Sequence, residues 1–437
     1  MGQINMKKIY LKNFKGFKES IIEFHDVNFL VGENSTGKTS LINLITLLSS
    51  REFWYTSSFN INEIELGYFE EILSKNSSDS FFQIGIEKTI QGREKNKENS
   101  YKSRFLFNYI KSEDSTPKVE WVRASIGQLN VHLILESKKT ESFYFIEEQA
   151  ENFLDWQSQF EKAEFTAIPI ETHLAQIPTA YLFRFVSDQI EKQAENTINE
   201  LDVPTSGFFE NELFSEYIQL APIRAKPKRI YESYNVKFSP EGDHIPALLR
   251  KILSQRGDNA KIIAMLEPFG KESNLFDSIE INSYGDNDTS PFEIVVKYGD
   301  VSIKLPNVGY GVSQILPLVI EILTTRKAMF SIQQPEVHLH PKAQAAFGEF
   351  LLKAYFNYEN NFIIETHSDF TINRFRYCLA QTEKKKDVSC QVLFFERKPT
   401  GNTVTKIPIN HDGSYGTELP SSYQDFFIDE ELKLLEL

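Results

Sequence analysis

The sequence predicts an α/β protein built around a largely parallel sheet. An apolar run at residues 27–31 is followed by a glycine-containing loop and then by an apolar helical pattern at residues 40–48. Strand and helix patterns also alternate over residues 328–380, as expected for parallel strands joined by crossover helices. By contrast, residues 67–146 hold short runs of β-branched and aromatic residues separated by polar segments. These runs predict an attached antiparallel sheet.

Composition is typical of an ordinary globular protein. The 437 residues are 41% hydrophobic and 25% charged, which suits two or three domains or one elaborated α/β domain. No apolar run is long enough for a membrane span, and the first residues lack the apolar core of a signal peptide, so we expect a cytoplasmic protein. The net charge of −14 argues against a surface that coats nucleic acid everywhere. The two cysteines, Cys378 and Cys390, lack metal-ligand spacing, and we expect them to fill the core.

The loop after the first buried strand fits the pattern G-x-x-x-x-G-K-[ST] as Gly32-Glu33-Asn34-Ser35-Thr36-Gly37-Lys38-Thr39. Glycines let the backbone N–H groups turn inward around phosphates, and the N-terminus of the next helix adds partial positive charge. We expect Lys38 to reach the β- and γ-phosphates and the Thr39 hydroxyl to bind Mg²⁺. A plain glycine turn before a core helix is the alternative, which the flanking strand and helix disfavour. The predicted nucleotide-binding residues are Asn34, Ser35, Thr36, Gly37, Lys38, Thr39 and Ser40.

The remaining patterns suggest how the chain is divided. We expect residues 1–66 and 208–437 to form the α/β core, with a helical subdomain at about 240–325. Residues 67–146 are expected to form the antiparallel β subdomain. Residues 147–207 are expected to form a helical insertion, because aromatic residues recur there at helical spacing among Glu, Gln and Lys.

Four polar or glycine-containing stretches follow predicted strands or precede a helix in the second half of the chain. They are residues 217–224, with Gln219 and Arg224; residues 307–314, with Gly311 and Ser313; residues 333–341, with Gln333, Gln334 and Glu336; and residues 365–368, with His367. Ligands of parallel α/β sheets bind at the carboxyl ends of the strands. The stretches that follow strands are therefore expected to lie at the nucleotide site.

Together these stretches resemble the ABC-type ATPases of the OLD, SMC and RecF kind. More closely, they resemble the stand-alone bacterial AAA-type, OLD-like ATPases of anti-phage systems such as Septu, PARIS and some retrons. The resemblance covers residues 7–48 and about 217–428, and it identifies residues 32–39 as a Walker A loop. It implies a mostly parallel ABC/SMC-like P-loop NTPase core with ATP and Mg²⁺ as ligands.

The same resemblance assigns roles to the later stretches. Gln219 would be the Q-loop glutamine, with Arg224 as an alternative group there. Gly311 and Ser313 belong to a signature motif that contacts the γ-phosphate bound by an opposite subunit, and His367 would be the switch histidine. Each has a plainer interpretation, a helix lead-in for the glycines and a satisfied core histidine for His367. The order and spacing of these stretches after the Walker A loop favour the functional interpretation of both the glycines and His367.

One departure from the wider family concerns the Walker B strand, which there ends in Asp-Glu. Here both positions hold amides, Gln333 at the metal position and Gln334 at the catalytic position. An amide is a weaker Mg²⁺ ligand than a carboxylate and cannot act as a general base. Glu336 is a candidate for the missing carboxylate, as is Glu365. The sequence therefore predicts tight ATP binding with slow or absent hydrolysis.

The resemblance implies an ATP-dependent switch. Two subunits would close head-to-tail over two nucleotides and control a separate effector, expected to be a nuclease encoded nearby, with DNA or a phage protein as the trigger. We see no acidic cluster of a TOPRIM nuclease, so a partner is expected to do any cutting. A RecF-like or SMC-like DNA clamp in repair is the alternative. A third alternative is a nucleotide-binding structural protein with a dead site, and a transporter ATPase is disfavoured by the SMC-like pattern at residues 7–17.

Overall fold

The computed structural model describes residues 7–61, 64–75, 77–94, 97–135, 140–168, 216–232, 237–255, 257, 259–287, 289–382 and 387–427. Most of the predicted helical insertion, residues 169–207, lies outside them. The chain forms two compact units. The first comprises residues 1–25, 33–215 and 395–404, and the second residues 26–32, 216–394 and 405–437. Within the described ranges, no helix has the length and apolarity that a bilayer crossing requires.

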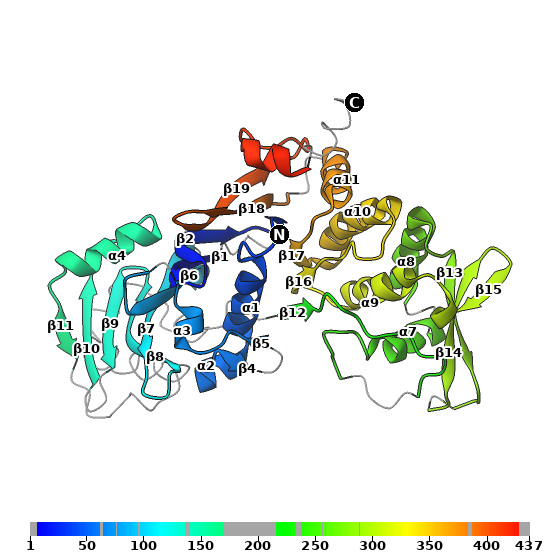
Figure 1. Ribbon diagram of the computed structural model, residues 1–437, viewed down its shortest axis with the longest axis horizontal. Helices are drawn as coiled ribbons and strands as arrows, with labels where there is room; N and C mark the ends of the chain where they lie inside the picture. The colour runs from blue at the N-terminus through cyan, green and yellow to red at the C-terminus, as the bar shows by residue number, and fades with distance from the viewer. Residues whose placement is uncertain are drawn as a thin grey trace. The chain divides into compact units, whose positions relative to one another are not determined.

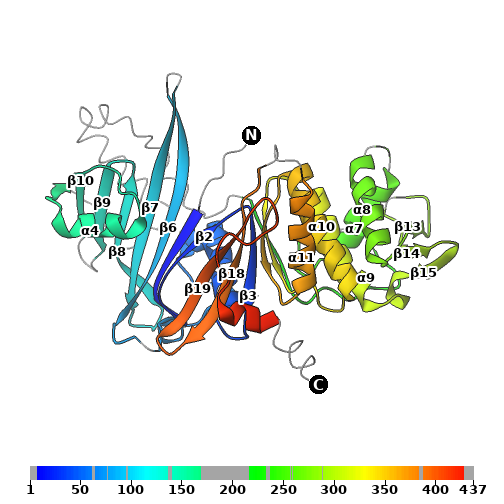
Figure 2. The same cartoon turned by 90° about the horizontal axis from the view of Figure 1, so that it is seen from above.

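An eight-stranded antiparallel sheet dominates the first unit (Figure 2). In spatial order its strands are β11 (Thr166–Ile168), β10 (Thr140–Ile146), β9 (Leu129–Leu135), β8 (Pro117–Ile126), β7 (Lys97–Lys111), β6 (Phe81–Glu94), β1 (Lys7–Phe14) and β2 (Phe17–Phe24). The antiparallel pairing of β6 to β10 is as predicted. The sheet also includes the N-terminal hairpin, which the sequence suggested was part of the parallel core. Ile9 pairs with Ile22 on one side and with Ile86 on the other, so β1 joins the two parts.

The helices in the described part of the first unit are α1 (Lys38–Ser49), α2 (Arg51–Thr56), α3 (Phe69–Ile72) and α4 (Phe153–Lys162), with short strands β4 (Asn60–Ile61) and β5 (Ile64–Glu65). Helix α4 packs on one face of the large sheet (Figure 1). Its Phe153 ring stacks on Tyr10 with centroids 5.0 Å apart. Gly85 makes room for this contact, because a Cβ atom there would lie 2.4 Å from Phe153 Cζ. The Trp156 indole also donates to Asn130 Oδ1 at 2.9 Å.

The second unit is organised around a six-stranded sheet. Its spatial order is β12 (Tyr217–Leu220), β16 (Met329–Gln333), β17 (Asn361–Glu365), β3 (Val27–Gly32), β18 (Cys390–Lys398) and β19 (Gly401–Ile409), the last two strands continuing into the first unit. The first four strands are parallel, as predicted. A separate antiparallel sheet contains β13 (Ser278–Ser283), β14 (Phe292–Tyr298) and β15 (Val301–Lys304).

The helices of the second unit include α7 (Ile245–Ser254), α8 (Ala260–Ser273), α9 (Tyr310–Thr324), α10 (Pro341–Tyr358) and α11 (Asp369–Ala380), with a short 3₁₀ helix, η3 (Leu305–Asn307). The region expected to form a helical subdomain, at about 240–325, begins with the two helices α7 and α8. They are separated around Gly257, whose residue type is the weakest helix former after proline.

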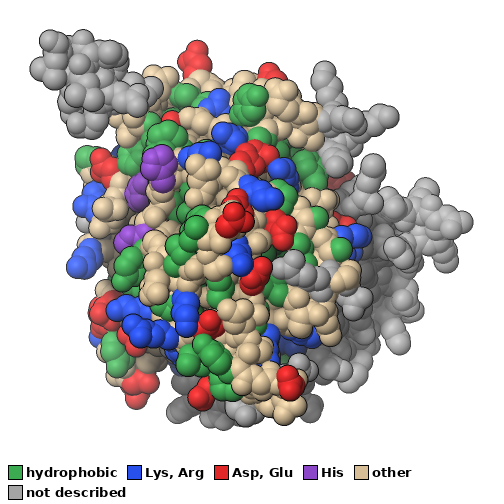
Figure 3. All heavy atoms as spheres, turned by 90° about the vertical axis from the view of Figure 1, so that its right-hand side faces the viewer, with side chains coloured by type: hydrophobic (Ala, Val, Ile, Leu, Met, Phe, Trp, Pro, Cys, Tyr) green, Lys and Arg blue, Asp and Glu red, His purple; other side chains and the backbone are tan. Residues whose placement is uncertain are grey.

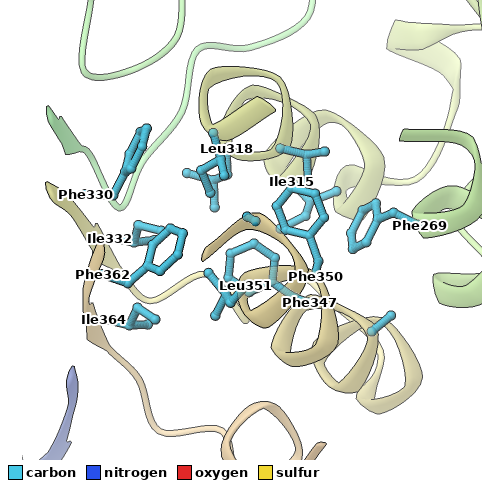
Figure 4. Packing of buried hydrophobic residues seen from close by; sticks show 14 of the residues in the cluster. Phe269, Ile315, Leu318, Phe330, Ile332, Phe347, Phe350, Leu351, Phe362 and Ile364 are labelled. Atoms are coloured by element: carbon cyan, nitrogen blue, oxygen red, sulfur yellow. The ribbon is translucent and has the colours of Figure 1, made fainter. Parts of the chain in front are cut away.

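Figure 4 shows how the parallel strands are anchored. Aromatic and aliphatic side chains of β16 and β17 face those of α9 and α10. They are Phe330 and Ile332, Phe362 and Ile364, Ile315 and Leu318, and Phe347, Phe350 and Leu351. This packing fixes the ends of the two strands side by side, so that Gln333 and Glu365 are Cα partners in the sheet.

Candidate nucleotide-binding site

The phosphate loop connects the end of β3 to the start of α1. Its backbone has positive φ angles at Gly32 (144°), Ser35 (63°) and Gly37 (98°). Glycine adopts such angles at little cost and serine does not. Gly37 is the N-cap of α1 and provides no side-chain cap. The N-terminus of a helix, with its partial positive charge, is an arrangement that binds phosphate groups.

Lys38 lies inside this loop. The residue is only 3% exposed, and its Nζ donates to the Glu33 carbonyl oxygen at 2.7 Å. The Thr36 hydroxyl donates to the same oxygen at 2.8 Å. A phosphate oxygen is a stronger partner for an ammonium group than a carbonyl, so a nucleotide can displace the Glu33 contact. Asn34 and Thr39 are exposed and Ser40 is partly exposed, which leaves these polar side chains accessible.

In the second unit, the predicted Walker B strand, β16, ends in a turn that holds a left-handed residue. Gln333 is the last residue of β16 and is buried. Gln334 follows with a φ of 45°, and its N–H donates to the Glu365 carbonyl at 2.8 Å. A left-handed non-glycine residue costs about 1–2 kcal/mol. Such strain is typical of functional sites, where the surrounding contacts hold it in place.

Glu336 lies in the same turn. Its Oε1 accepts from the His367 N–H at 2.7 Å, and its Oε2 accepts from the Thr366 hydroxyl at 2.9 Å. The Thr366 N–H in turn donates to Leu30 of β3 at 3.1 Å. The predicted catalytic carboxylate is therefore bound to the turn after β17, and it sets the backbone from which the predicted switch histidine projects.

His367 lies directly before α11. The next residue, Ser368, is the N-cap of that helix and accepts from Thr371 N–H at 3.1 Å. The Ser368 hydroxyl also donates to Gln344 of α10 at 2.6 Å. The His367 ring is partly exposed and lies 6.1 Å from the Phe426 ring. Rigid elements therefore place this imidazole at the carboxyl end of β17.

Arg224 is a buried cation beside the Walker B strand. It is 3% exposed, and its Nη2 donates to the Gln333 carbonyl at 3.2 Å. Its Nε and Nη1 have no hydrogen-bond partner among the described residues. Burial lowers the pKa of Arg224 to about 10, and the nearby Glu336 charge opposes that shift. Gln219 is on the neighbouring strand, where it pairs with Ser331. The structure thus brings Arg224, Gln333 and Glu336 together, a grouping that sequence reasoning did not identify.

The signature stretch forms the start of α9. Gly309 is the N-cap, and Gly309 and Tyr310 are both exposed. A Cβ atom at Gly311 would lie 3.0 Å from the His338 carbonyl oxygen, so the helix start packs closely on the turn after β16. Ser313 lies one turn further along, 7% exposed, and its hydroxyl donates to the Tyr310 carbonyl at 2.9 Å. The exposed helix end is therefore Gly309, which the sequence placed in the predicted signature stretch but not among the predicted binding residues, Gly311 and Ser313. A glycine directly before a helix is an N-cap signal.

The predicted magnesium ligands are neutral oxygens. In the part of the chain that the structure describes, no three His, Cys, Asp or Glu side chains are grouped to hold a metal ion. The Thr39 hydroxyl in the first unit and the Gln333 amide in the second unit are weaker ligands than carboxylates. Each is a type of ligand that suits Mg²⁺ when phosphates and water supply most of its bonds.

Comparison with known proteins assigns the family. Residues 6–372 match the AAA ATPase domain family. The DNA replication and repair protein RecF from two strains of Leptospira biflexa serovar Patoc is 30% identical over 119 residues, which is 24% of this chain and 30% of RecF. The chain thus spans less than a third of the length of these relatives.

Two solved structures are also similar to this chain. The SMC head domain from Thermotoga maritima aligns over 92% of this chain and 99% of its own, with 13% identity and a TM-score of 0.36. The Smc head domain with a coiled coil and joint from Pyrococcus yayanosii aligns over 98% and 99%, with 10% identity and a TM-score of 0.41. Because the family match extends over most of the sequence and includes the phosphate loop, the chain belongs to the AAA ATPase domain family, whose members bind nucleotide.

Proposed function

We propose that this protein is an ATP-binding, slowly hydrolysing switch. It self-associates head-to-tail around ATP and controls a separate effector, a nuclease, in bacterial anti-phage defence. The observation that carries the proposal is the pairing of a complete phosphate loop with a Walker B turn that holds Gln333 and Gln334. The first feature supports binding and the second supports slow turnover. The defence role and the effector rest on the family resemblance.

The residues divide the work between binding and chemistry. The loop amides and Lys38 bind the phosphates, and Mg²⁺, when bound with them, neutralises their charge and orients them. The Gln334 amide can hold a water molecule by hydrogen bonds but cannot take its proton. Both oxygens of the Glu336 carboxylate already accept a hydrogen bond, from the Thr366 hydroxyl and the His367 N–H, which ties this carboxylate to the turn after β17. Both features support long-lived bound ATP.

Self-association is supported by the exposed start of α9. Tyr310 is 62% exposed, and no described side chain makes a capping hydrogen bond at the N-terminus of this 15-residue helix. The partial positive charge of a helix N-terminus attracts an anion such as the phosphate bound by a second copy. ATP that bridges two copies favours the closed state by its differential affinity, and hydrolysis is not required for closing.

A RecF-like DNA clamp is the second candidate, and the partial similarity to RecF favours it. It predicts DNA affinity that falls steeply with salt. On the face that Figure 3 shows, Lys and Arg side chains are mixed with Asp and Glu among the described residues. Together with the net charge of −14, this mixing favours the switch over the clamp.

The deciding experiment is the native mass of the complex purified from cells with its chromosomal neighbours, with and without ATP, for the natural chain and for Lys38→Ala. A larger complex that carries an effector subunit, and whose composition changes with ATP only when Lys38 is present, is expected. A particle without an effector that binds duplex DNA only with ATP would replace the switch with the clamp.

A further inference from the structure

The β18–β19 hairpin contacts the phosphate loop within the first unit. Arg397, near the end of β18, donates from Nη2 to the Ser35 carbonyl oxygen at 2.8 Å. Asn402, at the start of β19, donates its N–H to the Gly16 carbonyl at 2.8 Å. A Cβ atom on Gly16 would lie 2.2 Å from Asn402 Nδ2, and a Cβ atom on Gly37 would lie 3.1 Å from it. The side-chain amide of Asn402 therefore packs closely against both glycines. A segment more than 350 residues away in sequence therefore supports this loop from outside.

The Arg397 contact acts on one peptide unit. The Ser35 carbonyl and the Thr36 N–H belong to the same peptide unit, and in a planar trans peptide they point in opposite directions. Holding the carbonyl toward Arg397 therefore directs the Thr36 N–H away from it. An inward-pointing N–H at this position is what a phosphate-binding loop requires.

The conformation of Ser35 explains why such a contact is needed. Its φ of 63° is in the left-handed region, which serine adopts at a cost that glycine avoids. Three residues later the chain enters α1, so a peptide flip at Ser35 would disturb the loop just before the helix that starts at Lys38. A charge-assisted hydrogen bond from a guanidinium is among the stronger contacts that can hold one rotational state.

We propose that Arg397 is a positioning residue for nucleotide binding. It holds the peptide between Ser35 and Thr36 so that its N–H faces the phosphates, and it does not itself contact the ligand. The inference rests on the proposed binding of ATP at this loop. It adds a role for the C-terminal hairpin, which the predicted site did not contain.

The test uses a matched pair of variants, Arg397→Ala and Lys398→Ala. Each removes one positive charge from the same strand, but Lys398 interacts with Glu396 and not with the loop. The measurement is the dissociation constant of a fluorescent ATP analogue, with melting temperatures of both variants recorded without nucleotide. Because the hydrogen bond between Arg397 and Ser35 is exposed to solvent, we expect Arg397→Ala to bind about 3- to 10-fold more weakly. Lys398→Ala should bind within about 2-fold of the natural chain.

Equal losses of ATP affinity in the two variants would mean that the loss of a positive charge, and not the contact with Ser35, weakens binding. That result would overturn the proposal. A fall in melting temperature in Arg397→Ala alone, with ATP affinity retained, would make Arg397 a stability residue and would also overturn it. If the natural chain itself does not bind the analogue, the proposed function fails, and that outcome is distinct because no variant is needed to see it.

A second variant separates positioning from direct contact. Glycine at position 35 adopts the left-handed conformation without strain, so Ser35→Gly in the Arg397→Ala background should recover most of the lost affinity. A direct bond from Arg397 to phosphate would instead leave the double variant as weak as Arg397→Ala. That result would contradict the positioning role.

Discussion

The Glu336 carboxylate accepts a hydrogen bond from the backbone N–H of His367 at 2.7 Å. With the Thr366 contact to the same carboxylate, it joins the turn after β16 to the turn after β17. Because the two strands are parallel neighbours, their carboxyl ends are already adjacent, and this bond fixes the relative positions of the two turns. A change at the Walker B turn is therefore transmitted directly to the predicted switch histidine.

Replacing Glu336 separates its structural role from a catalytic one. Glu336→Ala leaves the His367 N–H and the Thr366 hydroxyl without this acceptor, so we expect the free energy of unfolding to fall by about 1–3 kcal/mol. Glu336→Gln keeps one oxygen for the His367 N–H and should lose less than about 1 kcal/mol. Chemical denaturation checks the stability, and phosphate release checks the activity. Residual hydrolysis that is unchanged in Glu336→Gln would exclude Glu336 as the general base.

Removing Arg224 should destabilise the second unit. Its guanidinium bonds the Gln333 carbonyl, and its charge lies close to that of Glu336. Arg224→Ala leaves the buried Gln333 carbonyl without this donor, so it is expected to lower the free energy of unfolding by about 1–3 kcal/mol. Lys226→Ala, two residues along the same loop and exposed, is the control and should change it by less than about 0.5 kcal/mol. Equal effects from the two variants would show that Arg224 has no special role.

Restoring carboxylates to the Walker B turn should increase ATP turnover. Gln333→Asp supplies a better Mg²⁺ ligand, and Gln334→Glu supplies a base that can take a proton from water. General base catalysis is typically worth 10²–10⁴-fold, so we expect the double variant to hydrolyse ATP at least about 10-fold faster than the natural chain. Adding Lys38→Ala should abolish the gain. No increase in phosphate release would mean that the two amides are not what limits turnover.

His132 makes the stability of the first unit depend on pH. Burial, together with the opposing strand's Arg123, lowers the pKa of His132 to about 4. In the unfolded chain this histidine has its ordinary pKa near 6.5. Between about pH 4 and pH 6.5, the unfolded chain therefore binds more protons than the folded chain. Stability is therefore highest above about pH 6.5 and falls as the pH is lowered toward 4, by about 1–3 kcal/mol. His132→Phe should flatten this dependence in denaturation measured from pH 7 to 4, and an unchanged slope would contradict the assignment.

The sequence predicted the elements better than the contacts between them. Periodicity and glycine placement are local signals, so they predicted two stretches of the chain. One is strand β3 with the loop and helix α1 that follow it, and the other is the alternation of β16, α10, β17 and α11. The pairing of Ile9 with Ile86 was not, because cross-strand register depends on distant residues. The same limit applies to Arg224 with Gln333 and to Arg397 with Ser35. Each of these bonds joins residues more than 100 positions apart, and nothing local in the sequence indicates it.

ATP that binds at Lys38 and stays unhydrolysed is the basis of the proposed switch. The most direct measurement is a single titration of radiolabelled ATP against the natural chain and against Lys38→Ala, following bound nucleotide and released phosphate in the same samples. We predict saturable binding to the natural chain, loss of that binding in Lys38→Ala by at least about 10-fold, and bound nucleotide that remains mostly ATP. Binding that does not depend on Lys38, or phosphate release as fast as in ordinary ABC ATPases, would contradict the account.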